Sequence, residues 1–347
     1  MVLPAARARR PARHARLRRR HRSRRETGLR RILRRQTRDR HPALVLPGGG
    51  DQTLTRAAVP RPWILLPVHQ RRELTLRCLR QLRETQGDAG ATVAVIDAAS
   101  ADGTADAVRR EFPSVQVLPV SADHWWTGAI VHGMQAAAAA AAPAVLWLND
   151  DCLPDPGCIA RLLTHATGAA PALAGAVCRD DSDRPVPTAF AGRTALSAPP
   201  AGLPAVKVDG LSGFCVAVPR AAWTAVGFPD AVRFPHYGGD TAYTLAVGRA
   251  GVPVLLDGAA TARLSPYQER AHTVAAYVRR LPAGTATWAS VFRATGSPFR
   301  AATHLHYLRL RYGFVAGTLL AAGRLAGWQA AFIAAATGAG RGSAAAP

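Results

Sequence analysis

Short apolar runs and amphipathic segments alternate along residues 63–148. Four runs are apolar or alternate with period two, which is typical of β-strands: 63–68, 91–97, 114–120 and 144–148. Between them, 72–85 places Leu74, Cys78 and Leu82 four residues apart, and 105–112 and 133–142 also favour helices. Strands that alternate with helices at this spacing predict an α/β fold with a mostly parallel, doubly wound central sheet.

Polar residues stand where three of these strands end. His69 follows the first strand, Asp97 ends the second, and Asp150 and Asp151 follow the fourth. Ligands of such sheets bind at the carboxyl ends of the strands, so one crevice should collect these side chains. Hard divalent cations such as Mg²⁺ or Mn²⁺ prefer carboxylate oxygens and leave positions open for phosphate. A plain turn before a helix capped by Asp155 is the structural alternative for the acidic pair.

The charge of the chain is uneven. The 347 residues carry a net charge of +22, and residues 1–40 hold 17 arginines against Glu26 and Asp39. Arginine supplies all basic residues except Lys207, which suggests a coding bias as much as an anionic partner. Residues 1–60 are then rich in Pro and Gly and lack apolar periodicity, so we expect a disordered arm and linker there.

Cysteines and apolar segments bear on the compartment. The five cysteines are scattered without the close pairs of a zinc site, which favours a reduced, cytoplasmic setting. No apolar core follows the N-terminal arginines, so a secretory signal is not expected. The best candidate for a membrane span, 314–336, is interrupted by Arg324 and Gln329.

Residues 265–347 are predicted to form a helical extension with a disordered end. Leucine, aromatic and arginine residues mix along 304–328, which fits either an interfacial helix or a helical cap on the preceding domain. The first interpretation predicts peripheral association with the inner face of the cell membrane.

Six segments, in order, resemble the family 2 glycosyltransferases, most closely the bacterial rhamnosyltransferase-like branch. The resemblance covers about residues 62–260 and rests on LLPVHQRRELTLRCLRQL, VIDAASADGTAD, WWTGA, LNDDCLPDPG, DGLSGFCVAVPRAAWTAVGFPD and HYGGDTAYTLAVGRAG. It implies a GT-A type nucleotide-diphospho-sugar transferase fold over 61–264 and inverting transfer of a sugar, with rhamnose one option. The implied co-substrate is a nucleoside diphosphate sugar, the implied cofactor Mg²⁺ or Mn²⁺, and the implied acceptor a glycan or lipid-linked glycan, as in cell wall or polysaccharide biosynthesis.

The resemblance assigns roles position by position. Pro67, Val68 and His69 match the segment that touches the nucleoside, and Asp97 matches the acid that contacts the base. Asp150 and Asp151 match the metal–diphosphate motif, with Asp151 as the direct ligand, and Asp240 matches the general base. An in-line attack requires that base to lie across the pocket from the diphosphate.

A further set of residues is expected on the sugar or acceptor side. The alternative is core packing for the two tryptophans and a structural turn for Gly213, whereas His236 and Tyr237 could orient Asp240 or merely pack. Indole rings stack on sugars but also fill cores, and a glycine lets backbone approach a ligand. The set is Trp125, Trp126, Thr127, Gly128, Gly213, His236 and Tyr237.

Several positions depart from the family pattern. Val131 stands where Asn is usual, and Gly239 and Ala242 replace acids beside Asp240. These departures motivate a second hypothesis, a catalytically weak relative that binds nucleotide sugar or glycan without turnover. A third hypothesis assigns anionic-surface or nucleic-acid binding to the arginine-rich arm, although the arm has no aromatic residue for base stacking, so nucleic acid is not the expected partner.

Overall fold

The computed structural model describes residues 60–85, 87–266, 273–282 and 284–339. All of them belong to one compact unit, Ala58–Pro347. The arginine-rich arm predicted for residues 1–60 lies almost wholly outside the described residues, as does the end of the extension from residue 340 onward.

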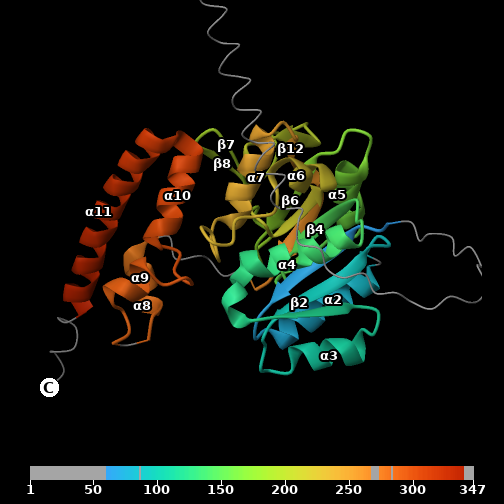
Figure 1. The fold of residues 1–347 in the computed structure, drawn as a ribbon, viewed down its shortest axis with the longest axis horizontal. Helices are drawn as coiled ribbons and strands as arrows, with labels where there is room; N and C mark the ends of the chain where they lie inside the picture. The colour runs from blue at the N-terminus through green and yellow to red at the C-terminus, as the bar shows by residue number, and fades with distance from the viewer. Residues whose placement is uncertain (1–59, 86, 267–272, 283, 340–347) are drawn as a thin grey trace, which may run out of the picture. The chain divides into compact units, whose positions relative to one another are not determined.

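A nine-stranded sheet forms the centre of this unit (Figure 1), in the order β3-β2-β1-β4-β11-β6-β12-β5, with β9 also paired to β12. The first four strands in this order are parallel, as predicted. β11 is antiparallel to both its neighbours, so the second half of the sheet is mixed. The strands are β1 Trp63–Val68, β2 Thr92–Ala98, β3 Gln116–Val120, β4 Ala144–Leu148, β5 Cys152–Pro154, β6 Leu173–Arg179, β9 Ala205–Lys207, β11 Cys215–Pro219 and β12 Val254–Leu264.

Helices cover both faces of the sheet. Successive residues of β1 point to opposite faces, so Ile64 and Leu66 pack in one core and Trp63 and Leu65 in the other. The first core includes side chains of α2 (Arg72–Glu84), α3 (Thr104–Glu111) and α5 (Cys158–Thr167). The second includes α4 (Trp125–Ala139), α6 (Arg220–Val226) and α7 (Gly239–Arg249). The predicted α/β class is confirmed.

Helix α4 begins eight residues earlier than the alanine run suggested. The sequence favoured a helix over 133–142, but the structure extends it back to Trp125, after a short 3₁₀ turn at Ala122–His124. Ala129, Ile130 and Met134 are buried against the sheet, so packing stabilises turns that intrinsic propensity did not indicate. The WWTGA segment is therefore the start of a helix and not a loop.

A small second sheet, in the order β10-β7-β8, lies between β6 and β11 in the chain. Its strands are β7 Ala189–Ala191, β8 Thr194–Leu196 and β10 Gly210–Leu211. β10 packs beside α7, where the Leu211 N–H donates to Thr244 Oγ1 at 2.9 Å. This contact joins β10 to the middle of α7, whose first turn carries Asp240.

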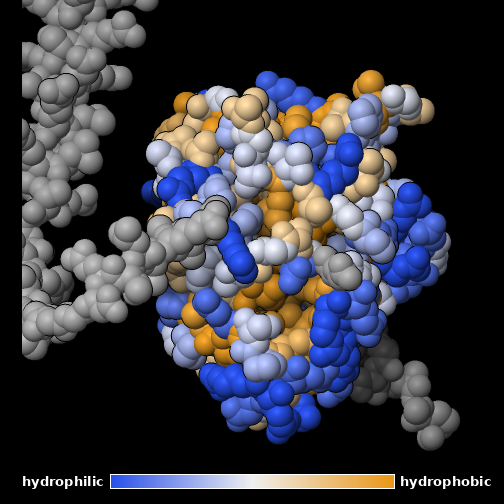
Figure 2. Space-filling view, turned by 90° about the vertical axis from the view of Figure 1, so that its right-hand side faces the viewer, coloured by the Kyte–Doolittle hydropathy of each residue, from blue (hydrophilic) through white to orange (hydrophobic). Residues whose placement is uncertain are grey.

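The predicted helical extension is confirmed, and its described residues form four helices, at the left of Figure 1: α8 Val274–Arg280, α9 Trp288–Phe292, α10 Ala301–Tyr312 and α11 Phe314–Ala339. α8, α9 and α11 share a separate apolar cluster built on Val274, Val291, Phe292 and Phe299. By length and hydropathy, Phe314–Ala336 is a candidate membrane span. Figure 2 shows the side of the unit away from this extension, where hydrophilic residues surround a hollow with hydrophobic residues. All five cysteines are buried and free.

Candidate functional site

The ends of the parallel strands bring the predicted donor-side residues to one edge of the sheet. Val68, the last residue of β1, pairs in register with Asp97 of β2, and β4 lies on the other side of β1. β4 ends at Leu148, so Asn149, Asp150 and Asp151 follow at the same edge. This is the edge at which parallel α/β sheets bind their ligands.

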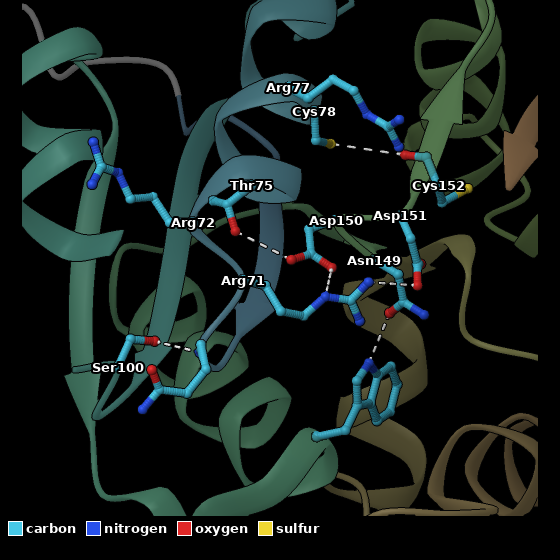
Figure 3. Close-up of polar contacts among 12 residues, drawn as sticks. Arg71, Arg72, Thr75, Arg77, Cys78, Ser100, Asn149, Asp150, Asp151 and Cys152 are labelled. Carbon is cyan, nitrogen blue, oxygen red and sulfur yellow. Dashed lines mark hydrogen bonds and ion pairs between the residues drawn. The ribbon is translucent and has the colours of Figure 1, made fainter. Parts of the chain in front are cut away.

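A guanidinium joins the two carboxylates of the acidic pair (Figure 3). Arg71 Nη2 donates to Asp151 Oδ2 at 2.8 Å, and Arg71 Nε lies 3.2 Å from Asp150 Oδ1. Thr75 in the first turn of α2 donates its hydroxyl to Asp150 Oδ2 at 3.1 Å. Adjacent carboxylates are thus tolerated here because a cation lies between them. Arg71 follows β1 closely and reaches across the sheet edge to the end of β4.

Asp150 is almost completely enclosed, with 2% of its surface exposed. Burial is the main cause that raises its pKa to about 6, and the neighbouring Asp151 raises it further, whereas Arg71 and the Thr75 hydroxyl lower it. Ionised Asp150 at neutral pH therefore has a cost in free energy that Arg71 only partly offsets.

Asp151 presents one oxygen that no side chain or backbone group uses. Its Oδ1 is buried and has no hydrogen-bond partner among the described residues, while Oδ2 receives Arg71. Its backbone is fixed, since the Ser265 N–H donates to the Asp151 carbonyl at 2.8 Å. A free carboxylate oxygen fits a hard divalent cation. Within the described part of the chain, no group of three or more His, Cys, Asp or Glu could hold a metal alone, so a cation here would need oxygens from a ligand.

A cavity of about 530 Å³ connects the acidic pair with the predicted general base. The predicted site residues on its wall are Pro67, Trp126, Asp150, Asp151, Gly213, His236, Tyr237 and Asp240. Arg71, Asn149 and Ser212 also line it, and no pattern in the sequence singled them out. This volume lies within the usual range of small-molecule sites.

Asp240 is held in place by two backbone donors. The Gly213 N–H donates to its Oδ2 and the Thr241 N–H to its Oδ1, each at 2.7 Å. It is in the first turn of α7, which begins at Gly239 after Gly238 in a left-handed conformation (φ 76°). These bonds fix the rotamer of the carboxylate at the wall of the cavity and leave its remaining lone pairs to accept a proton.

Two glycines of this wall are required by close contacts. A Cβ at Gly213 would lie 2.7 Å from the Trp126 ring and 3.0 Å from Asp240 Cβ. A Cβ at Gly239 would lie 2.3 Å from Thr127 Oγ1. The hydroxyl of Thr127 therefore occupies the space that a side chain at position 239 would need. This gives a physical reason why the acid of the family pattern is missing at Gly239.

The two tryptophans differ in their surroundings. Trp126 lines the cavity, donates from Nε1 to Asn149 Oδ1 at 2.8 Å and packs edge-to-face on the buried Trp147. Trp125 has a positive φ of 51°, is 37% exposed and lies 5.2 Å from His236, ring centre to ring centre. Trp126 thus packs in the core and also lines the cavity, whereas Trp125 packs beside the ring of His236.

Besides Trp125, five predicted residues do not line this cavity. Thr127 and Gly128 are buried in the first turns of α4, and Val68 is buried at the end of β1. Asp97 is 5% exposed and its Oδ1 accepts from the Ser100 N–H at 3.2 Å. His69 is exposed, and its Nδ1 lies 2.7 Å from the Ala98 carbonyl oxygen. His69 and Asp97 belong to the adjoining β1–β2 edge, where a nucleoside is expected, whereas Thr127 and Gly128 pack under the cavity wall.

Sequence reasoning missed Arg71, although it stands immediately before α2. Because the chain has 43 arginines, an arginine after a strand end did not stand out as a site residue. What could have pointed to it is the acidic pair itself, because two adjacent buried carboxylates need a cation. Asn149 entered only as part of a motif, and its partner Trp126 is 23 residues earlier.

Comparison with known proteins finds one family model that matches part of the chain. Residues 63–210 match the model of Glycosyl transferase family 2. No curated protein matches the chain significantly. The family match supports the GT-A architecture expected from the sequence and says nothing of the rhamnosyltransferase-like branch.

Several solved structures are similar to the chain at low identity. GalNAc-T7 with UDP, GalNAc and Mn²⁺ shares 13% identity with a TM-score of 0.48, over 64% of this chain and 48% of that one. The mannosyltransferase PcManGT from Pyrobaculum calidifontis with GDP-Man and Mn²⁺ shares 18% identity with a TM-score of 0.46, over 80% of this chain and 86% of that one. S. aureus TarS 1-349 with UDP shares 10% identity with a TM-score of 0.47, over 74% of this chain and 70% of that one. The chain thus spans about half of the GalNAc-T7 structure. The family model matches residues 63–210, which is less than half of the chain.

Proposed function

We propose that the protein is a metal-dependent inverting glycosyltransferase that uses a nucleoside diphosphate sugar. The observation that carries this proposal is one cavity lined by Asp150 and Asp151 after β4 and by Asp240 at the start of α7. The family 2 match supports the same class of reaction. The proposed acceptor is a hydroxyl of a glycan or lipid-linked glycan, and rhamnose remains one candidate sugar.

The roles of the residues follow from their positions. His69 and Asp97 would bind the nucleoside at the edge of β1 and β2. Asp151 would hold a divalent cation through its unpartnered Oδ1, with Asp150 and Arg71 behind it. When bound, such a cation supplies positive charge that stabilises the departing diphosphate.

Asp240 would act as the general base. It takes the proton of the acceptor hydroxyl as the acceptor oxygen forms a bond to the anomeric carbon, and the bond from that carbon to the diphosphate oxygen breaks with its electron pair. The Gly213 and Thr241 N–H groups keep the carboxylate in one orientation during this step. Attack and departure on opposite faces invert the anomeric centre.

A nucleotide-binding experiment tests this proposal. The melting temperature of the full chain is measured with UDP, GDP or dTDP, each with and without Mn²⁺, beside Asp151→Ala and the exposed control Asp106→Asn. We expect one nucleotide to stabilise the parent and the control only with metal, and Asp151→Ala to lose that response. A metal-independent response in every variant would contradict the assigned metal site. Absence of any response in the parent would contradict the proposed donor site.

A further inference from the structure

The last helix, α11, exposes several large apolar side chains along one side. Phe314, Val315 and Leu319 are each about 70% exposed, and Leu320 and Ile333 are 48% and 61% exposed. Between 314 and 336 the only polar residues with exposed side chains are Arg324 and Gln329. Large contiguous apolar surface on a helix marks an interaction face, because water solvates it poorly.

The opposite side of α11 is packed against its own extension. Trp328 lies 5.0 Å from Phe299 and 4.4 Å from His304, ring centre to ring centre. Near its start, a Cβ at Gly317 would lie 2.4 Å from the Leu308 carbonyl oxygen, so α10 and α11 touch backbone to backbone. A helix held in this way presents one face to a partner. Spanning a membrane would uncover the cluster around Phe292 and Phe299.

Among the residues that the structure describes, net positive charge is concentrated on the same extension. Residues 61–266 contain 17 basic and 18 acidic residues, so this domain is close to neutral. Residues 273–339 contain seven arginines and no acidic residue. Arg324 is exposed about midway along α11, and its long stem can keep the guanidinium at the polar surface. An apolar face accompanied only by positive charge fits an anionic lipid surface.

We propose that the exposed face of α11 docks on a membrane that contains anionic phospholipid, with the helix lying at the interface. The exposed aromatic rings of Tyr312 and Trp288, 38% and 46% exposed, are of the type enriched at the level of lipid headgroups. A second copy of the chain fits less well, because a two-fold pairing of this face would bring arginine-rich, acid-free surfaces together.

The extension is also joined to the acceptor side of the cavity. Thr303 Oγ1 of α10 donates to the Arg233 carbonyl oxygen at 3.2 Å, and Phe234 lies 6.4 Å from the His306 ring. The segment that contains Arg233 and Phe234 continues directly into His236, Tyr237 and Gly238, which line the cavity. Docking through α11 would therefore hold the cavity near a lipid surface. Resting on the proposed function, this favours an acceptor hydroxyl carried by a membrane lipid.

Vesicle binding by the full chain tests the docking directly. Co-sedimentation is measured with vesicles of equal phosphatidylglycerol and phosphatidylcholine at 0.15 M and 0.5 M NaCl. The variants are Leu319→Gln with Ile333→Gln, and the matched control is Leu203→Gln, a 52% exposed leucine outside the extension. We expect the double variant to weaken partition at least about tenfold, since it removes two apolar side chains from the interface, and the control to bind as the parent does.

Salt and alkaline extraction distinguish docking through α11 from binding by the N-terminal arm and from a spanning helix. Binding through α11 should persist in part at 0.5 M NaCl. Binding through the arm alone would be lost at that salt concentration and would be the same in the α11 variants as in the parent. The second result would overturn the proposal. The parent could instead form dimers without binding vesicles, and the double variant could be monomeric. That result would assign the face to a second copy of the chain. Resistance to alkaline extraction would indicate a spanning helix and would also overturn it. None of these readouts needs a nucleotide, so they do not depend on the enzymatic proposal.

Discussion

Arg71 Nη2 lies 2.8 Å from Asp151 Oδ2, and through its Nε the same guanidinium reaches Asp150. This ion pair joins the end of β1 to the end of β4 and supplies the positive charge that makes two adjacent carboxylates tolerable. The proposed metal would add a second cation at the free oxygen of Asp151. We therefore expect the free energy of unfolding to depend on divalent cations, and mutation of Arg71 to change that dependence.

Replacing Arg71 with methionine should make the fold depend more on added metal. The variant keeps much of the apolar stem of the side chain but leaves Asp150 and Asp151 without their guanidinium. Because Arg71 is 38% exposed, we expect a loss of about 1 kcal/mol in the free energy of unfolding. Calorimetry with and without Mn²⁺ should show a larger metal-induced rise in melting temperature for Arg71→Met than for the parent. Equal rises would show that the metal and the arginine do not share the acidic pair.

Asp150→Asn should stabilise the protein at neutral pH while weakening its function. The pKa of Asp150 in the fold, about 6, lies above its ordinary value of 3.8, so folding favours the protonated form. Its stabilising contribution is complete below pH 4 and is lost as pH rises through about 6. The neutral amide avoids that loss.

Chemical denaturation between pH 4 and 8 measures this difference. The free energy of unfolding of Asp150→Asn relative to the parent should exceed its pH 4 value by about 1 to 3 kcal/mol above pH 7. Asp106→Asn, on the exposed face of α3, should show no such trend. A difference that does not change with pH would contradict the raised pKa of Asp150.

Gly239 and Thr127 should show energetic coupling. A methyl group at position 239 meets the Thr127 hydroxyl at 2.3 Å, so Gly239→Ala should destabilise the protein by about 1 to 3 kcal/mol. Removing the obstacle with Thr127→Ala should reduce that cost, which a double-mutant cycle measures. Gly323→Ala, where a Cβ meets nothing within 4 Å on α11, should be neutral or stabilise by up to about 1 kcal/mol. Additive effects at 239 and 127 would refute the steric interpretation.

The strands and their polar ends could be predicted because they depend on local patterns. The apolar runs before His69, Asp97 and Asp150 determine both the strands and the side of the sheet on which these residues emerge. Arg71 could not be selected in the same way, because its role depends on a partner 80 residues later. The early start of α4 was missed since packing of Ile130 and Met134 decides it.

The cavity wall around Asp240 shows the same limit. Family resemblance pointed to Asp240, and the structure places it beside Gly213, with a hydrogen bond that sequence spacing does not reveal. Gly239 looked like a lost acid, and only the contact with Thr127 explains it. Sequence therefore proposed the chemical groups, whereas the contacts among them could be found only from three-dimensional packing.

The most direct test of the proposed chemistry is cleavage of a nucleotide sugar by the full chain. Release of UDP, GDP or dTDP from the corresponding sugar nucleotides is followed with Mn²⁺ and water as acceptor, for the parent, Asp240→Asn and Asp106→Asn. We predict that one donor class is cleaved, that Asp240→Asn slows its cleavage about 100-fold or more, and that nucleotide affinity is kept. Asp106→Asn should match the parent. Cleavage at the parent rate by Asp240→Asn, or none by any protein, would contradict the assignment of Asp240 as the base of a working glycosyltransferase.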